Sequence, residues 1–270
     1  MTVIAAVIGP KIMAIASDSF KTKYVKSKGI YEVVEFKRPK IIPVQKYYAA
    51  ISFWGLVDYG NWSLERYLRR LISNSSPDFS LEQFANYIAS QLSQELDRII
   101  PGSPNIKGFG IHLTGYERYK EFMVPELFLI SNYDGISYAK LKESFVSERH
   151  LYPYASTKLN LKATDYAGQR EVILAFFKTG SIFYFNNGDP ELFTPIAKGY
   201  YYSVNRYRLR IKSRTLTVDG YRQMARGPVE TIKTLQKRFA PTGKQLVGGK
   251  IHDLVITYRG QYSSSSGLKV

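Results

Sequence analysis

The sequence predicts an α+β fold in which strands and helices form separate layers. Apolar runs rich in β-branched residues come first, two segments with helical periodicity follow, and further strands, a helical region and a last strand complete the chain. Because strands and helices are grouped instead of alternating, a layered α+β fold is favoured over βαβ units. The 270 residues, 44% of them hydrophobic, suffice for one large domain with a substantial core.

The first strands are predicted around a Gly-Pro turn. Val3–Ile8 and Ile12–Ala16 are continuous apolar runs separated by Gly9-Pro10-Lys11, a pattern typical of a hairpin that is buried on both faces. Ile41–Val44 and Tyr47–Phe53 form a second predicted strand pair.

Two helices are predicted next. The first begins after Ser63, and its apolar face consists of Leu64, Leu68, Leu71 and Ile72. The second begins after Pro77, where Ser80 and Gln83 fit a capping box. Its apolar stripe consists of Leu81, Phe84, Ile88, Leu92 and Leu96.

Strands return in the middle of the chain. Gly108–Thr114 and Leu127–Ser131 are predicted strands around a charged loop, Glu117–Glu121, and Ile136–Lys140 continues the sheet. The pattern does not decide the structure between about residues 145 and 194, where Glu171–Phe177 fits either a helix or a strand.

The last third is predicted to hold a long helix and a final strand. The helix has Thr217 as its N-cap and ends near Phe239, and Gly227-Pro228 is expected to kink or split it. Leu254–Thr257 is the strand. No repeat or linker is visible, so residues 1–262 are assigned to a single domain and the serine-rich residues 263–270 to a flexible tail.

The amino-acid composition excludes some kinds of chemistry and indicates the charge of a binding partner. The absence of cysteine excludes disulfides and thiolate chemistry, and the three histidines form no metal-ligand motif, so no metal or other cofactor is expected. The formal net charge of +16 favours an acidic partner, a protein or a nucleic acid, unless it only prevents association. No stretch approaches the roughly 18 apolar residues of a membrane helix, and no targeting segment is visible, so a cytoplasmic protein without membrane contact is expected.

The opening hairpin resembles the N-terminus of proteasome β-subunits and their bacterial relatives. It runs from Thr2 through the apolar hairpin to the Ala16-Ser17-Asp18-Ser19 step, and Thr2 and Asp18 have the separation found in that family. Lys40 and the following strand, with Gly55 and Asp58, resemble the family's lysine strand, and Val247–Ile256 resembles its Gly-Gly strand. The resemblance covers the first half of the chain well, the C-terminal part moderately and the middle hardly at all.

The resemblance implies both a fold and a reaction. The fold is the four-layer αββα sandwich of two antiparallel sheets found in N-terminal-nucleophile hydrolases, with an insertion between about residues 140 and 215. The implied reaction is hydrolysis of an amide or peptide bond in a peptide or protein substrate by a threonine-type peptidase, and the implied assembly is a homo-oligomer.

The same resemblance assigns roles to four residues. Removal of Met1 exposes the amine of Thr2, which acts as general base for its own hydroxyl. Lys40 lowers the pKa of that hydroxyl, and Asp18 holds Lys40 in place. The backbone N–H of Trp54, at the loop position of the family's glycine, stabilises the oxyanion. Each of three residues also has a non-catalytic interpretation. Thr2 could be the second residue of a chain that keeps Met1, Asp18 could cap the end of the hairpin, and Lys40 could be one of several surface cations.

Departures from the family pattern leave a second function open. The family has an Asp and a Ser near the end of the third helix to orient the amine, whereas Lys244–Val247 supplies neither, and Trp54 would crowd the substrate groove. The alternative is a catalytically inactive relative that acts as a binding or assembly scaffold for an acidic partner. His252 and Asp253 face opposite sides of a strand, so they are assigned structural roles.

A row of basic residues is independent of the resemblance. Five cations alternate with uncharged residues at Arg206, Arg208, Arg210, Lys212 and Arg214. In a strand they share one face and could bind phosphate groups or an acidic partner, with Tyr200–Tyr202 nearby for stacking. The alternative, which we favour because base-reading motifs are absent, is an edge strand that its charges protect from aggregation.

Overall fold

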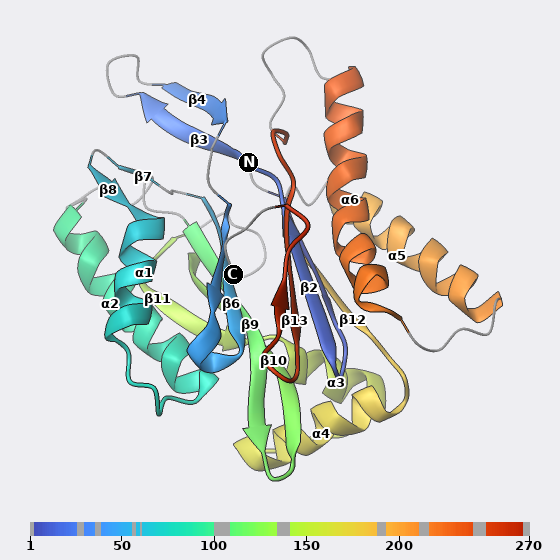
Figure 1. Cartoon of the computed structure of the whole chain (residues 1–270). Helices are drawn as coiled ribbons and strands as arrows, with labels where there is room; N and C mark the ends of the chain where they lie inside the picture. Colours follow the sequence, from blue (N-terminus) through green and yellow to red (C-terminus); the bar gives the residue numbers. More distant parts are fainter. Residues whose placement is uncertain are drawn as a thin grey trace. The chain divides into compact units, whose positions relative to one another are not determined.

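The computed structural model of the chain (Figure 1) describes residues 3–25, 30–35, 39–55, 58–59, 61–99, 109–133, 141–187, 193–210, 216–239 and 247–266. The chain divides into two compact units. The first comprises Met1–Lys21, Val33–Ile41 and Ala175–Val270, and the second comprises Thr22–Glu32 and Ile42–Leu174. The predicted single domain over residues 1–262 and its insertion at about 140–215 stay predictions.

The first unit contains a five-stranded antiparallel sheet in the order β12-β1-β2-β13-β14. Its strands are β1 (Ile4–Ile8), β2 (Ile12–Ser17), β12 (Phe183–Asn187), β13 (His252–Thr257) and β14 (Tyr262–Ser263). The pair β1 and β2 is the predicted Gly-Pro hairpin, with Ile4 opposite Ser17 and Ile8 opposite Met13. Because β2 lies between β1 and β13, the ends of three strands meet beside Ser17, which pairs with Ile4 and with His252.

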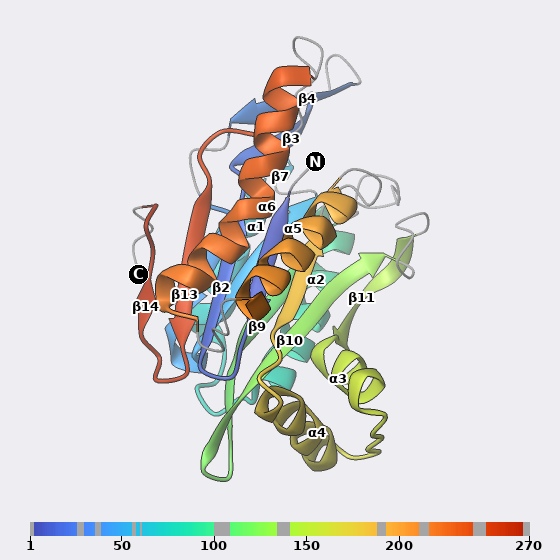
Figure 2. The same ribbon diagram turned by 90° about the vertical axis from the view of Figure 1, so that its right-hand side faces the viewer.

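Two helices cover one face of this sheet, α5 (Phe193–Arg210) and α6 (Val218–Phe239). Figure 2 shows both in front of the strands β1, β2 and β12. The core between them takes alternate residues of each strand, since successive side chains point to opposite faces. It includes Val3, Ala5, Val7, Ala14 and Ala16 from the hairpin, and Met224, Val229 and Ile232 from α6.

The start and the middle of α6 follow the sequence closely. The predicted N-cap is confirmed, because the hydroxyl of Thr217 accepts the amide of Gly220 at 3.1 Å. The helix passes through Pro228 without splitting. Proline removes one helical hydrogen bond, and the hydroxyl of Thr231 donates to the carbonyl of Gly227 at 2.9 Å. The alternative of a split helix at Gly227-Pro228 is therefore wrong.

The predicted basic strand is also wrong. Arg206, Arg208 and Arg210 belong to α5, and Lys212 and Arg214 lie outside the described residues. The helical pattern begins before the basic residues. Phe193, Ala197 and Tyr201 recur every four residues and are buried in the core, and this packing determines the structure despite the alternation of charge. The strand geometry that was expected to place the five cations on one face is therefore absent at Arg206–Arg210.

The second unit is built around another five-stranded antiparallel sheet, in the order β11-β10-β9-β6-β5. Its strands are β5 (Ile41–Val44), β6 (Ala49–Gly55), β9 (Phe109–Tyr119), β10 (Phe122–Tyr133) and β11 (Leu141–Arg149). The hairpin of β9 and β10 is longer than predicted, since Glu117 is still paired within it, opposite Val124. The predicted strand at Ile136–Lys140 lies outside the described residues. Two-stranded ribbons are formed by β3 (Phe20–Val25) with β4 (Ile30–Glu35), and by β7 (Asp58–Tyr59) with β8 (Trp62–Ser63).

Helices α1 (Leu64–Asn74) and α2 (Leu81–Ile99) cover one face of the second sheet, and a short 3₁₀ turn, η1 (Gln45–Tyr47), joins β5 to β6 (Figure 1). The capping box of α2 is confirmed: Gln83 donates its amide to the Ser80 hydroxyl at 3.1 Å, and Ser80 donates its amide to the Gln83 side chain at 2.8 Å. Ser63 precedes α1 without any side-chain capping bond.

The region that the sequence left undecided forms α3 (Leu151–Leu159) and α4 (Tyr166–Lys178), so Glu171–Phe177 is helical. A buried ion-pair network joins α4 to the β9–β10 hairpin. Arg149 contacts Glu126 through Nε at 2.8 Å and donates to Gln169 at 2.7 Å, and Arg170 pairs with Glu117. Burial raises the pKa of the Glu126 carboxyl to about 7, although Arg149 opposes the shift.

Residues 263–266 differ from the expected tail because a buried carboxylate holds them. Asp253 accepts the amide of Ser265 at 3.0 Å and its hydroxyl, and it donates its own amide to the Ser266 hydroxyl at 3.2 Å. The same carboxylate pairs with Arg222 at 3.2 Å and with Arg226 at 2.7 Å. These hydrogen bonds hold the pKa of Asp253 below its usual range against the effect of burial.

These elements confirm the predicted α+β class, with two antiparallel five-stranded sheets and helices packed on them. Within the described ranges, no helix combines the length and the apolar character that a membrane span requires.

Candidate active site at the Asp18–Lys40 pair

A buried ion pair lies at the end of strand β2. The Nζ atom of Lys40 is 3.2 Å from Oδ1 of Asp18, and neither side chain is exposed. Asp18 directly follows β2, and Lys40 directly precedes β5. Two of the four predicted catalytic residues are thus in contact, and the alternative in which Lys40 is a surface cation is wrong.

The Asp18 carboxylate is held by four donors. Oδ1 accepts the amide of Val3 at 3.0 Å in addition to the ammonium of Lys40. Oδ2 accepts the amide of Phe20 at 3.2 Å and that of Gly248 at 3.4 Å. A carboxylate with this many charge-assisted hydrogen bonds has a fixed position, so Asp18 can serve as a rigid support for a neighbouring group.

Lys40 is held between two acceptors, because its ammonium also donates to the carbonyl of Phe20. Burial lowers the pKa of Lys40, while the charge and the hydrogen bond of Asp18 act in the opposite direction. The positive charge of Lys40, kept by its pairing with Asp18, lowers the pKa of a neighbouring hydroxyl or amine.

Main-chain contacts bring two other segments of the chain to this pair. Asp18 donates its amide to the carbonyl of Val3 at 3.2 Å, and Ser19 donates its amide to the carbonyl of Gly248 at 3.2 Å. Gly249, the next residue, has a φ of 68°, a left-handed conformation that favours glycine. The Gly-Gly segment is therefore the turn before β13, and it contributes an amide to the site.

Three buried polar atoms beside the pair have no hydrogen-bond partner among the described residues: Ser17 Oγ, Ser19 Oγ and His252 Nδ1. Ser17 and His252 face each other across β2 and β13, and their residues are 0% and 6% exposed. Buried polar groups usually bind a partner, so these atoms mark a place where water or a polar substrate atom can be held. Burial lowers the pKa of His252, which favours its neutral form.

The other predicted site residues fall in different places. Thr2 lies outside the described residues. Trp54 lies in β6 of the second unit, where its indole stacks on His112 with ring centroids 4.4 Å apart. Gly110 makes room for this stack, since a Cβ atom there would lie 2.1 Å from the indole. Of the basic residues, Arg206 lies over the ring of Tyr202 on α5, at 5.9 Å from its centroid.

Sequence reasoning missed part of this site. It did not select Ser17 or Ser19 individually, although both stand in the quoted Ser-Asp-Ser step, and it assigned His252 only a structural role. The contribution of Gly248 could not be deduced from local pattern, because 230 residues separate it from Asp18. Among the described residues, no group of His, Asp and Glu side chains could hold a metal ion.

No protein-family model matches the sequence, and no curated protein does. Among solved structures, the chain is similar to Anbu (ancestral beta-subunit) from Yersinia bercovieri, with a TM-score of 0.44 and 14% sequence identity. The match covers 98% of this chain and 88% of that chain.

Proposed function

We propose that the protein is an N-terminal-nucleophile hydrolase that cleaves amide bonds with Thr2 after Met1 has been removed. One observation carries the proposal: the buried Asp18–Lys40 pair is hydrogen-bonded to the amide of Val3, the residue that follows Thr2 in the chain. The fully buried pair is costly to keep unless it has a role, which supports a catalytic function.

In the proposed reaction, the free amine of Thr2 takes the proton of its own hydroxyl while Oγ attacks the substrate carbonyl carbon. The amide C–N bond breaks, the proton passes to the leaving amine, and an ester to Thr2 remains. Water, deprotonated by the same amine, hydrolyses the ester. Lys40 supports the attack by stabilising the developing negative charge on Oγ, and Asp18 keeps Lys40 in place.

The backbone N–H of Trp54 is proposed as the oxyanion donor, as the sequence resemblance implies. Three further residues, Ser17, Ser19 and His252, extend the proposal. Their buried polar atoms have no partner among the described residues, and this sequence lacks the family's usual Asp and Ser. They are proposed to hold the water or the amine in position.

The test starts with the intact mass of the protein as purified from its host. We expect a mass without Met1, and turnover of a fluorogenic peptide library that Thr2→Ala reduces about 1000-fold or more. Thr2→Ser is the matched control, because it keeps the hydroxyl, and it should keep measurable turnover. Full retention of Met1, or equal activity of Thr2→Ala and the wild type, would overturn the proposal.

A second function is favoured by the Trp54 side chain and the net charge of +16. If Trp54 blocks substrate, the fold serves as an inactive scaffold that assembles with itself and binds an acidic partner. Retention of Met1 together with a homo-oligomer in light scattering would support this function, whereas turnover that depends on Thr2 would exclude it.

A further inference from the structure

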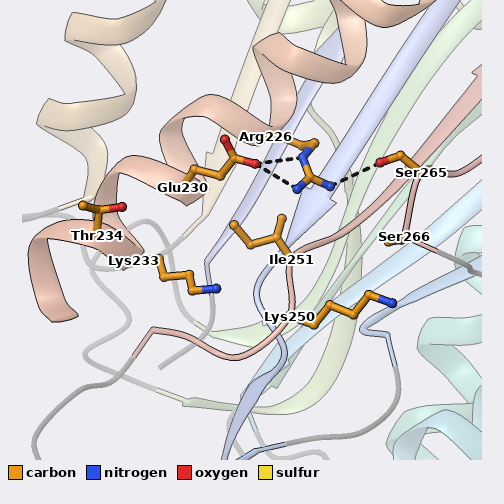
Figure 3. Close-up of a pocket in the computed structure, with 8 residues that line it drawn as sticks. All are labelled: Arg226, Glu230, Lys233, Thr234, Lys250, Ile251, Ser265 and Ser266. Carbon is orange, nitrogen blue, oxygen red and sulfur yellow. Dashed lines mark hydrogen bonds and ion pairs between the residues drawn. The ribbon is translucent and has the colours of Figure 1, made fainter.

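A cavity in the first unit has no part in the proposed reaction. Its volume is about 500 Å³, and it is lined by one face of α6, the segment before β13 and the serines after β14 (Figure 3). Cavities of this size take small organic ligands. The lining residues are Arg226, Glu230, Lys233, Thr234, Lys250, Ile251, Ser265 and Ser266.

The charge of this lining is positive. Three cations face a single carboxylate, Glu230, and that carboxylate is already occupied. Arg226 contacts Glu230 at 2.8 Å and donates to it through Nε at 2.9 Å. Glu230 and Arg226 therefore offset each other, and the positive charge of Lys233 and Lys250 remains for a ligand.

The two lysines differ in how they are held. Lys233 is half-buried, and its ammonium donates to the carbonyl of Gly249 at 2.5 Å, so its side chain is oriented while other N–H groups of the ammonium are left for a ligand. Lys250 is exposed and extends from the other wall (Figure 3). The two ammonium groups come from separate segments, and Figure 3 shows the Lys250 side chain pointing away from Lys233, so both reach one anion when the exposed Lys250 side chain turns towards it.

The wall beside Arg226 is rigid. The buried Asp253 binds Arg226 at 2.7 Å from behind, and the Arg226 guanidinium also donates to the Ser265 hydroxyl at 3.3 Å. The hydroxyl of Thr234 and the side chain of Ile251 complete the lining, while the Ser265 hydroxyl already donates to Asp253. The cavity therefore offers charged donors, one neutral donor and an apolar contact.

We propose that this cavity binds a phosphate group, carried by a small organic molecule or as inorganic phosphate. A phosphate dianion matches two lysines, and its several oxygens can accept from the ammonium groups and from the Thr234 hydroxyl together. A single carboxylate carries half that charge and fewer acceptor atoms. The proposal does not depend on Thr2 or on the Asp18–Lys40 pair.

Isothermal titration at low ionic strength tests the proposal with three probes: inorganic phosphate, phenyl phosphate and benzoate. We expect both phosphates to bind, and Lys233→Gln and Lys250→Gln each to weaken binding about tenfold, as the loss of one charge-assisted hydrogen bond implies. Lys237→Gln is the matched control, since Lys237 is exposed on α6 one turn beyond Lys233 and does not line the cavity. It should leave the affinity unchanged.

The outcomes separate the alternatives. Tighter binding of phenyl phosphate than of inorganic phosphate supports an organic phosphate, and equal binding supports inorganic phosphate. Absence of binding, equal binding of benzoate, or equal weakening by Lys237→Gln would overturn the phosphate site. Thermal melts without ligand show whether each variant is folded, and a folded Lys250→Gln suffices if Lys233→Gln does not fold.

Discussion

The two members of the Asp18–Lys40 pair depend on each other to different degrees. Asp18 receives three backbone amides besides the ammonium, from Val3, Phe20 and Gly248. Lys40, by contrast, has Asp18 as its counter-ion in a site without solvent exposure. Removing one partner of a buried pair leaves the other charge uncompensated, and the size of that penalty depends on which hydrogen bonds remain.

This asymmetry gives a prediction for stability. We expect Asp18→Ala to lower the free energy of unfolding by about 3–5 kcal/mol, because it removes the counter-ion of the buried Lys40 ammonium and the acceptor of three amides. Lys40→Met should cost less, because the carboxylate keeps its amide donors. Urea unfolding followed by circular dichroism measures both values. An equal or larger cost of Lys40→Met would show that the amides do not compensate Asp18.

Glu126 is the residue whose protonation is expected to shape the pH dependence of stability. Its pKa is raised from 4.5 to about 7 by burial, so the folded state binds a proton that the unfolded state releases between these values. Its contribution is therefore complete below about pH 4.5 and is lost as the pH rises through about 7. The upper limit of the effect is on the order of 3 kcal/mol.

Glu126→Gln tests this expectation, since glutamine has the shape of the protonated carboxyl and does not titrate. The free energy of unfolding of the wild type, relative to Glu126→Gln, should fall between pH 5 and 7 in urea titrations. Glu171→Gln is the control, because Glu171 is exposed and its ion pair with Lys120 lies at the surface. A constant difference between wild type and Glu126→Gln over this range would contradict the expectation.

At the scale of elements, turn and capping residues in the sequence were sufficient to predict the hairpin and the helix starts. The Gly-Pro hairpin and the caps at Ser80 and Thr217 were predicted correctly, because each depends on residues only a few positions apart. The prediction of a strand for the basic segment was wrong because its structure depends on residues outside the segment. Its alternation was local, but the helical state of Arg206–Arg210 follows from packing of earlier residues of α5 in the core.

The two serines that precede α1 and α2 allow a matched comparison. Ser80 forms both bonds of its capping box, whereas Ser63 forms no capping bond. We expect Ser80→Ala to lower the free energy of unfolding by about 1 kcal/mol and Ser63→Ala to lower it by clearly less. Chemical unfolding of the two variants measures the difference, and equal losses would contradict the assignment.

The candidate site could be predicted only in part. The spacing of Thr2, Asp18 and Lys40 indicated the pair, because those residues lie in a short segment that resembles a known family. The amide of Gly248 and the pairing of Ser17 with His252 arise from strand order, which brings β13 next to β2. Single-sequence patterns do not contain that information, since the two strands are more than 200 residues apart.

For the whole molecule, each unit has its own hydrophobic core and its own sheet. In each sheet one strand is central, β2 in the first unit and β9 in the second. We expect the amides of β2 and β9 to show the slowest hydrogen exchange, and those of the edge strands β14 and β11 to exchange faster. Exchange followed by mass spectrometry measures these rates, and fast exchange of β2 or β9 would mean that the cores are not the most stable parts.

The Asp253 cluster has a consequence for a chain without cysteine. The buried carboxylate binds Ser265 together with Arg222 and Arg226, and the backbone amide of Asp253 binds Ser266, so this residue joins the segment after β14 to α6 as a covalent cross-link would. This link forms without an oxidant and is unaffected by thiols or glutathione. The strength of the link depends instead on pH and ionic strength, so salt or acid would weaken it whereas a reductant would not.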